Sequence, residues 1–288
     1  MNWLFISLFC AFCVATADAL SKKVLKEKNE YIVLWVRIGF ASPFLLCFLP
    51  FIEIPTLDHT FFLILIFLVP LETTALILYM KAIKISPLSM TLPFLALTPG
   101  FLIVTSNIIL GERLHKHGII GVLLVTLGAY LLNAKMSRQG ILQPFKAILR
   151  ERGSVYMIIV AFIYSITSNL GKLAIQHSSP LFFSATYFPF LSLVLFPLLL
   201  WKNNGKIRQP LSSHLSLFIL IGLLIVFSTV SHFYAVTLTE VPYFISVKRT
   251  SLLFGILYGA ILFKEKNIAE RLVGGMVMIA GVIVIVLF

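Results

Sequence analysis

Ten long apolar runs constrain the fold of this chain more than any other feature of its sequence. They occupy residues 2–20, 31–51, 61–80, 88–110, 117–134, 154–175, 181–201, 215–236, 241–263 and 267–287. About 20 apolar residues form a helix long enough to cross a bilayer, and only helices and closed barrels satisfy their backbone hydrogen bonds there. Only 12% of the 288 residues are charged, against about 25% in soluble domains. We therefore predict an all-α membrane protein with ten transmembrane helices.

The two halves of the chain repeat each other. At an offset of 153 residues, four identities fall in matching runs: Ala82/Ala235, Glu112/Glu265, Gly121/Gly274 and Gly128/Gly281. We predict a first five-helix repeat over residues 1–134 and a second over residues 154–288, inverted because five spans is an odd number. Inverted repeats are typical of transporters, whose solute site lies between the repeats near the bilayer midplane.

The longest connection, residues 135–153, joins the two predicted repeats. It mixes apolar and basic residues around Pro144, a composition typical of a short helix lying on the membrane surface. We therefore interpret residues 135–153 as a basic interfacial linker.

Loop charges predict the orientation of the chain in the membrane. The connections after helices 1, 3, 5, 7 and 9 carry 17 Lys and Arg residues, whereas the other connections carry only Arg113 and Lys116. Basic connections stay in the cytoplasm. We therefore predict a multi-pass protein of the cytoplasmic (inner) membrane with both termini outside.

The motifs at the end of each predicted repeat resemble those of the drug/metabolite transporter superfamily, of the ten-helix EamA type. They are Gly111-Glu112 followed by two glycines, and Lys264-Glu265 followed by two glycines at the same spacing. The resemblance implies a ten-helix transporter, although many members have both termini in the cytoplasm. We interpret Glu112 and Glu265 as structural, since a carboxylate at the start of a helix complements its dipole.

A pair of adjacent cations, Lys248-Arg249, interrupts the apolar run 241–263. Each intramembrane cation costs about 2.5–3.5 kcal/mol on insertion scales, so the pair should face a cavity, a partner or a ligand. The pair also resembles the Lys-Arg pair that binds phosphate in plastid triose-phosphate/phosphate translocators. Consecutive helical residues point about 100° apart, but an anion between helices can still contact both. The alternative is that one cation pairs with Glu72 and the other with backbone carbonyls.

Glu72 lies near the middle of the third run, two residues after Pro70 and too deep to reach the interface. Desolvation favours the neutral form of a carboxyl group, so Glu72 is a candidate for proton coupling. The alternative is a permanent ion pair with Arg37 or Lys248.

Five further residues complete the expected substrate site: Arg37, Lys172, Tyr79, His232 and Tyr234. The first two are intramembrane cations, and Tyr79 corresponds to His232 at the offset of 153. The alternatives are a salt-bridge partner for Arg37, an interfacial anchor for Lys172, and interhelical hydrogen bonding for the other three residues.

The sequence shows no motif of a metal site, a nucleotide-binding loop or a serine hydrolase, so we predict no enzyme activity, cofactor or metal. The net charge of +12 resides mostly in short connections, so it does not indicate nucleic-acid binding. The expected partners are a small anionic solute and the lipid bilayer, with the fifth and tenth helices peripheral and available for a homodimer contact.

The sequence therefore predicts a secondary transporter for a small anionic metabolite, working by alternating access between the repeats. One alternative is an exporter of amino acids or amphipathic compounds in which the intramembrane cations are structural. Another is a membrane-embedded enzyme that modifies lipids.

Overall fold

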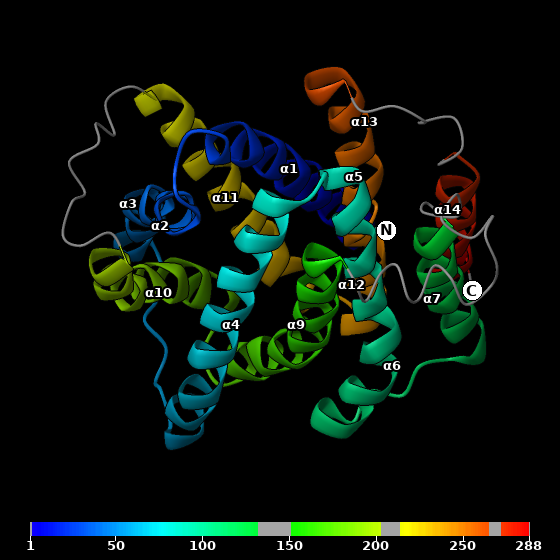
Figure 1. The fold of residues 1–288 in the computed structure, drawn as a ribbon. Helices are drawn as coiled ribbons and strands as arrows, with labels where there is room; N and C mark the ends of the chain where they lie inside the picture. The colour runs from blue at the N-terminus through cyan, green and yellow to red at the C-terminus, as the bar shows by residue number, and fades with distance from the viewer. Residues whose placement is uncertain (1, 132–150, 203–213, 265–271, 288) are drawn as a thin grey trace.

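A computed structural model of the protein describes residues 2–131, 151–202, 214–264 and 272–287, which are predominantly helical (Figure 1). The first half contains α1 (Asn2–Leu25), α2 (Glu30–Gly39), α3 (Ala41–Leu46), η1 (Leu49–Phe51), α4 (His59–Ile85), α5 (Leu88–Thr91), η2 (Leu92–Ala96), α6 (Leu97–Leu110) and α7 (Lys116–Leu131). The second half contains α9 (Arg152–Gln176), α10 (Pro180–Lys202), α11 (Leu215–Ala235), α12 (Val241–Lys248), α13 (Ser251–Phe263) and α14 (Leu272–Leu287). The expected interfacial linker lies almost wholly outside the described residues.

The helices fall on the ten apolar runs. Seven of the described helical stretches are long and apolar enough to cross a membrane, and the stretches 94–110, 116–129 and 273–287 are shorter apolar helices. The second, fourth and ninth runs are each divided into consecutive shorter helices. The prediction of an all-α protein with ten apolar helical segments is confirmed.

The fourth and ninth segments break at equivalent points of the two halves. In the fourth, the 3₁₀ segment η2 separates α5 from α6, and in the ninth Arg249 and Thr250 separate α12 from α13. The offset of 153 aligns Lys248-Arg249 with the end of η2. Both segments also end in left-handed residues at matching positions, Gly111 (φ 70°) and Lys264 (φ 53°). The repeat thus extends to backbone conformation.

The packing of the central helices follows the same symmetry. The equivalents of α1 and α4 are α9 and α11, and the most extensive central contacts pair α4 with α9 and α1 with α11. When each helix is replaced by its equivalent in the other half, the α4–α9 pair becomes the α11–α1 pair. The helices of the two halves therefore interlock rather than forming separate bundles.

The fifth and tenth segments, α7 and α14, pack against each other at one edge of the molecule (Figure 1). Glycines allow the close approach: a Cβ added to Gly281 would lie 2.7 Å from the carbonyl oxygen of Gly121, and one added to Gly128 would lie 2.7 Å from that of Gly274. The two glycine pairs run in opposite directions along the helices, as inverted repeats require. The expected peripheral position of these helices is correct, and the homodimer contact stays a prediction.

Four of the connections between the apolar segments lie together at one end of the bundle. Lys84 pairs with Glu30 at 2.6 Å, and the imidazole of His214 contacts Glu27 at 2.9 Å. Ser86 bonds the carboxylate of Glu151. These contacts join the connections after the first, third, fifth and seventh segments, which carry most of the basic residues, at what we call the basic end.

Candidate functional site

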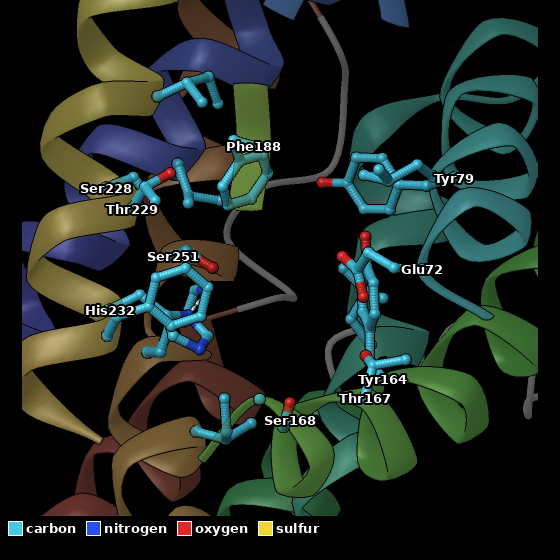
Figure 2. Close-up of a pocket in the computed structure, with 18 of the residues that line it drawn as sticks. Glu72, Tyr79, Tyr164, Thr167, Ser168, Phe188, Ser228, Thr229, His232 and Ser251 are labelled. Atoms are coloured by element: carbon cyan, nitrogen blue, oxygen red, sulfur yellow. Dashed lines mark hydrogen bonds between the residues drawn. The ribbon is translucent and has the colours of Figure 1, made fainter. Parts of the chain in front are cut away.

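A cavity of about 160 Å³ lies between the two halves of the chain. Residues from α1, α2, α4, α9, α10, α11, α12 and α13 line it, and Figure 2 shows side chains projecting into it from opposite walls. Its charged and imidazole residues are Asp18, Arg37, Glu72, Lys172, His232, Lys248 and Arg249. The cavity therefore gathers six of the seven residues that the sequence predicts for substrate binding, together with Glu72.

Arg37 on α2 forms an ion pair with Asp18 on α1. Its Nη1 lies 2.6 Å from the Asp18 carboxylate and 3.3 Å from the hydroxyl of Ser21, and both charged residues are buried. Tyr79 on α4 donates a hydrogen bond to the other Asp18 oxygen. This buried network joins three helices of the first half, and it satisfies Arg37 without a ligand. The sequence alternative in which Arg37 pairs with Glu72 is wrong.

Lys172 at the end of α9 is also satisfied by the protein. Its Nζ lies 2.6 Å from Oε1 of Glu112 and 2.8 Å from the carbonyl oxygen of Thr239. The other Glu112 oxygen accepts a hydrogen bond from the backbone N–H of Val241, at the start of α12. Glu112 does complement a helix N-terminus, but the helix belongs to the other half of the chain. The sequence could not indicate this because the partner is 129 residues away.

Lys172 has a counterpart at the basic end. Lys22, which aligns with Lys172 at an offset of 150, donates to the carbonyl oxygen of Ser86 at 2.6 Å. Ser86 aligns with Thr239 at the offset of 153. Equivalent lysines therefore hold equivalent connections in the two halves, as an inverted repeat predicts.

We predict that Lys172→Met and Glu112→Gln each lower the free energy of unfolding by about 1–3 kcal/mol, because each leaves a largely buried polar group unpaired. The double variant should lose less than the sum of the single variants. Denaturation of the purified protein in detergent would measure these changes. Strict additivity would show that Lys172 and Glu112 do not interact, and Lys172 would then be free to bind the solute.

Lys248 points toward α11, where its Nζ lies 2.7 Å from Nδ1 of His232. An ammonium group has no acceptor, so the ring nitrogen accepts the hydrogen bond and the imidazole is neutral. No carboxylate within the described ranges lies at ion-pair distance from Lys248. The charge of Lys248 is therefore presented to the cavity without a counter-ion.

Arg249 points the other way, toward α6. Its Nη2 donates to the hydroxyl of Thr98 at 2.9 Å, and its buried Nε has no hydrogen-bond partner in the described part of the chain. This bond connects the two broken segments, since Thr98 lies just after η2. Arg249 thus links the two halves, and as a residue it also lines the cavity.

Glu72 lies on the opposite wall from His232 (Figure 2), beside Tyr164 and Thr167 of α9. No ion pair to Glu72 occurs among the described residues, because Arg37 is taken by Asp18 and Lys248 by His232. The expected alternative of a permanent ion pair is therefore not formed. Glu72 and the Lys248-Arg249 pair therefore face the cavity without an ion-pair contact between them, although Lys248 is within electrostatic reach of Glu72.

Tyr234 does not belong to the cavity, and its side chain is 47% exposed on the outside of α11. Residues two apart on a helix point about 200° apart, so Tyr234 cannot share the inward face that places His232 at the cavity. We remove Tyr234 from the candidate site.

Sequence reasoning missed several polar features of the site: Asp18 as the partner of Arg37, Thr98, Thr167 and Tyr187. Only Thr98 could have been found from the repeat, because it aligns with Ser251 at the offset of 153. Ser251 lines the cavity, and Thr98 accepts the hydrogen bond from Arg249. Hydroxyl residues are too common in membrane helices for the others to be recognised.

Comparison with known proteins identifies the family to which this architecture belongs. The model of the EamA-like transporter family matches residues 1–134 and 151–287. The chain belongs to the EamA-like transporter family. A solved crystal structure matches with a TM-score of 0.71 over 99% of this chain and 96% of the other, at 13% sequence identity, and therefore supports the fold alone. No curated protein sequence matches the chain. Membership of this family makes the protein a multi-pass membrane transporter, and the central cavity is its candidate solute site.

Proposed function

We propose that this EamA-like protein is a secondary transporter that moves a small anionic metabolite across the cytoplasmic membrane. The anion would bind between Lys248 and Arg249 in the central cavity. Alternating access would come from movement of the interlocked halves around the breaks in the fourth and ninth segments. In the proposed orientation, the basic end faces the cytoplasm and both termini lie outside.

One observation supports the anionic substrate above the others. The cavity is lined by four intramembrane cations, of which Arg37 and Lys172 each bond a carboxylate. Lys248 and Arg249 have no carboxylate partner among the described residues, and their bonds go to neutral groups. Cations without a counter-ion are costly inside a membrane. Binding of an anion that neutralises them removes this cost and is therefore favourable.

The two cations offer different chemistry to the same anion. Lys248 presents a point charge that is oriented by His232, whereas the planar guanidinium of Arg249 has several N–H donors and can bond a second oxygen of the anion. A carboxylate or a phosphate group has the oxygens to accept both. Phe183, Phe188 and Phe233 line the same cavity and would contact the remainder of the solute.

The test is ligand-dependent thermal stability of the purified protein, because a compound that binds the folded state stabilises it by mass action. The panel is inorganic phosphate, sulfate, succinate, glucose 6-phosphate, glutamate and a nucleotide sugar. We expect at least one anion to stabilise the wild type. Lys248→Ala should weaken its binding by about 1.5–3 kcal/mol, the usual contribution of a hydrogen bond to a charged group and about 10- to 100-fold in affinity.

Two further variants separate ligand binding from structure. Thr98→Val removes the hydroxyl that Arg249 contacts but keeps the guanidinium, so it should lower stability and retain anion binding, whereas Arg249→Ala should lose both. Lys202→Ala, which removes an exposed cation at the end of α10, is the matched control and should change neither. If only neutral or zwitterionic compounds stabilise the protein, and Lys248→Ala responds equally, the cations are structural and the exporter alternative replaces this proposal.

A further inference from the structure

Glu72 occupies a position that neither the packing nor the anion site explains. It lies in the middle of α4, two residues after Pro70, and lines the cavity without an ion-pair partner in the described residues. A carboxyl group held in a membrane interior is costly, and such groups usually mark ion or proton pathways. A purely structural role for an ionised Glu72 would require a permanent cationic partner, and among the described residues its carboxyl group bonds only the hydroxyl of Thr167.

The second half of the chain surrounds the Glu72 carboxyl with hydroxyl groups. Tyr164 and Thr167 project from α9 on the same wall as Glu72 (Figure 2). Tyr187 on α10 is within electrostatic reach of Glu72, and its buried hydroxyl has no hydrogen-bond partner in the part of the chain that the structure describes. Hydroxyl groups both donate and accept hydrogen bonds. They can therefore accommodate Glu72 as a carboxylate or as a carboxylic acid.

The other charged groups around the cavity make the state of Glu72 decisive for the net charge. The groups on the elements around Glu72 are Asp18 (α1), Arg37 (α2), Tyr164 and Lys172 (α9), Tyr187 (α10), His232 (α11), Lys248 (α12) and Arg249. Asp18 cancels Arg37, and Glu112 cancels Lys172. The neutral His232 leaves Lys248 and Arg249 against Glu72, so the net cavity charge is +1 with Glu72 ionised and +2 with Glu72 protonated.

We propose that Glu72 is the binding site of a coupling proton and that the protein is a proton–anion symporter. The proposal rests on the anion site proposed above. Protonation of Glu72 removes the negative charge that faces the anion across the cavity, so the proton and the anion bind with positive cooperativity. Because such coupling is reciprocal, the bound anion raises proton affinity by the same factor. The proton comes from the solution on one side and leaves with the anion on the other, with no covalent step.

The first experiment measures binding of sulfate and succinate to the purified wild-type protein by calorimetry from acidic to alkaline pH. Sulfate keeps a constant charge over this range, so a change in its affinity reports the protein. Couplings between sites typically change affinity about 5- to 150-fold, and we expect a loss of about tenfold or more as the pH rises. Glu72→Gln, which imitates the protonated carboxyl, should bind at every pH as the wild type binds in acid. Glu53→Gln, at an exposed carboxylate, should behave as wild type.

A second variant tests the other titratable group at the anion site. His232→Gln should weaken binding but retain its pH dependence, because the imidazole is the acceptor for Lys248 and not the proton carrier. If His232→Gln abolishes the pH dependence and Glu72→Gln preserves it, the proposal is overturned and His232 is the coupling group. An anion that binds with pH-independent affinity also overturns it but leaves the anion site intact. Absence of binding by any anion in the panel would instead refute the proposed function itself.

Transport provides an independent readout. In proteoliposomes, an imposed pH gradient should drive the wild type to concentrate the anion on the alkaline side. Glu72→Gln should still exchange internal for external anion but should not respond to the gradient. A Glu72→Gln variant that still concentrates the anion when the gradient is imposed would place the coupling site elsewhere.

Discussion

Replacing Arg37 with methionine is expected to lower the free energy of unfolding by about 3–5 kcal/mol, the usual cost of removing one partner from a buried ion pair. The Asp18 carboxylate would keep only its hydrogen bond from Tyr79 and would lose the charge that compensates it. Chemical denaturation of the purified protein in detergent or bicelles measures the change. The expected effect is a loss of stability, which can be measured without a transport assay.

The size of this effect comes from burial, which the control variants test. Asp18→Asn combined with Arg37→Met removes both charges and should be less destabilised than Arg37→Met alone. Lys84→Met breaks the more exposed pair with Glu30, whose side chains are 37% and 19% accessible, and should cost about 1 kcal/mol or less. Equal losses for Arg37→Met and Lys84→Met would contradict the assignment of Arg37 as a buried structural cation.

Replacing Gly281 with valine should be comparably damaging, for a steric reason. Even the Cβ of an alanine would lie 2.7 Å from the carbonyl oxygen of Gly121 and 2.7 Å from the backbone nitrogen of Val125. Both obstacles are backbone atoms, which cannot move aside as a flexible side chain can, so α7 and α14 would be forced apart. Overpacking of this kind costs about 1–3 kcal/mol and sometimes more, and valine adds two further methyl groups.

The matched control is Gly100→Ala on α6. A Cβ there would lie 3.6 Å from the side chain of Thr126, an ordinary van der Waals contact. We expect Gly100→Ala to be near neutral or slightly stabilising in a thermal unfolding assay, and Gly281→Ala to be intermediate between wild type and Gly281→Val. Because α7 and α14 do not line the cavity, the Gly281 variants should retain anion affinity in whatever fraction remains folded. Wild-type stability of Gly281→Val would show that the two helices do not approach so closely.

Much of the candidate site was predictable because charge is scarce in this chain. Asp18, Arg37, Glu72, Lys172, Lys248 and Arg249 are conspicuous within apolar runs, and all of them line the cavity. The sequence pattern did not indicate which of these charged residues pair with each other. Whether Arg37 contacts Asp18 or Glu72 depends on how α1, α2 and α4 are rotated about their axes, and an apolar run surrounded by lipid and protein carries little periodicity to indicate rotation.

Tyr234 and Glu112 illustrate the two ways in which sequence reasoning fell short. Tyr234 was grouped with His232 by proximity in the sequence, but two residues along a helix reach opposite faces. Glu112 was assigned to the helix that follows it, whereas its carboxylate meets the start of α12 and Lys172. Both outcomes depend on the placement of neighbouring helices, which local sequence does not encode.

The sequence by itself determined the class, the number of apolar segments and the repeat, because a bilayer requires long apolar helices and because repeated glycines remain visible in the chain. The tertiary structure alone decided which charges are neutralised. Arg37 and Lys172 form ion pairs with carboxylates, whereas within the described parts of the chain Lys248, Arg249 and Glu72 bond only neutral groups. The difference is physical: an ion pair requires two atoms within about 4 Å. Glu112 and Lys172 are 60 positions apart in the sequence and reach that distance only when the helices pack.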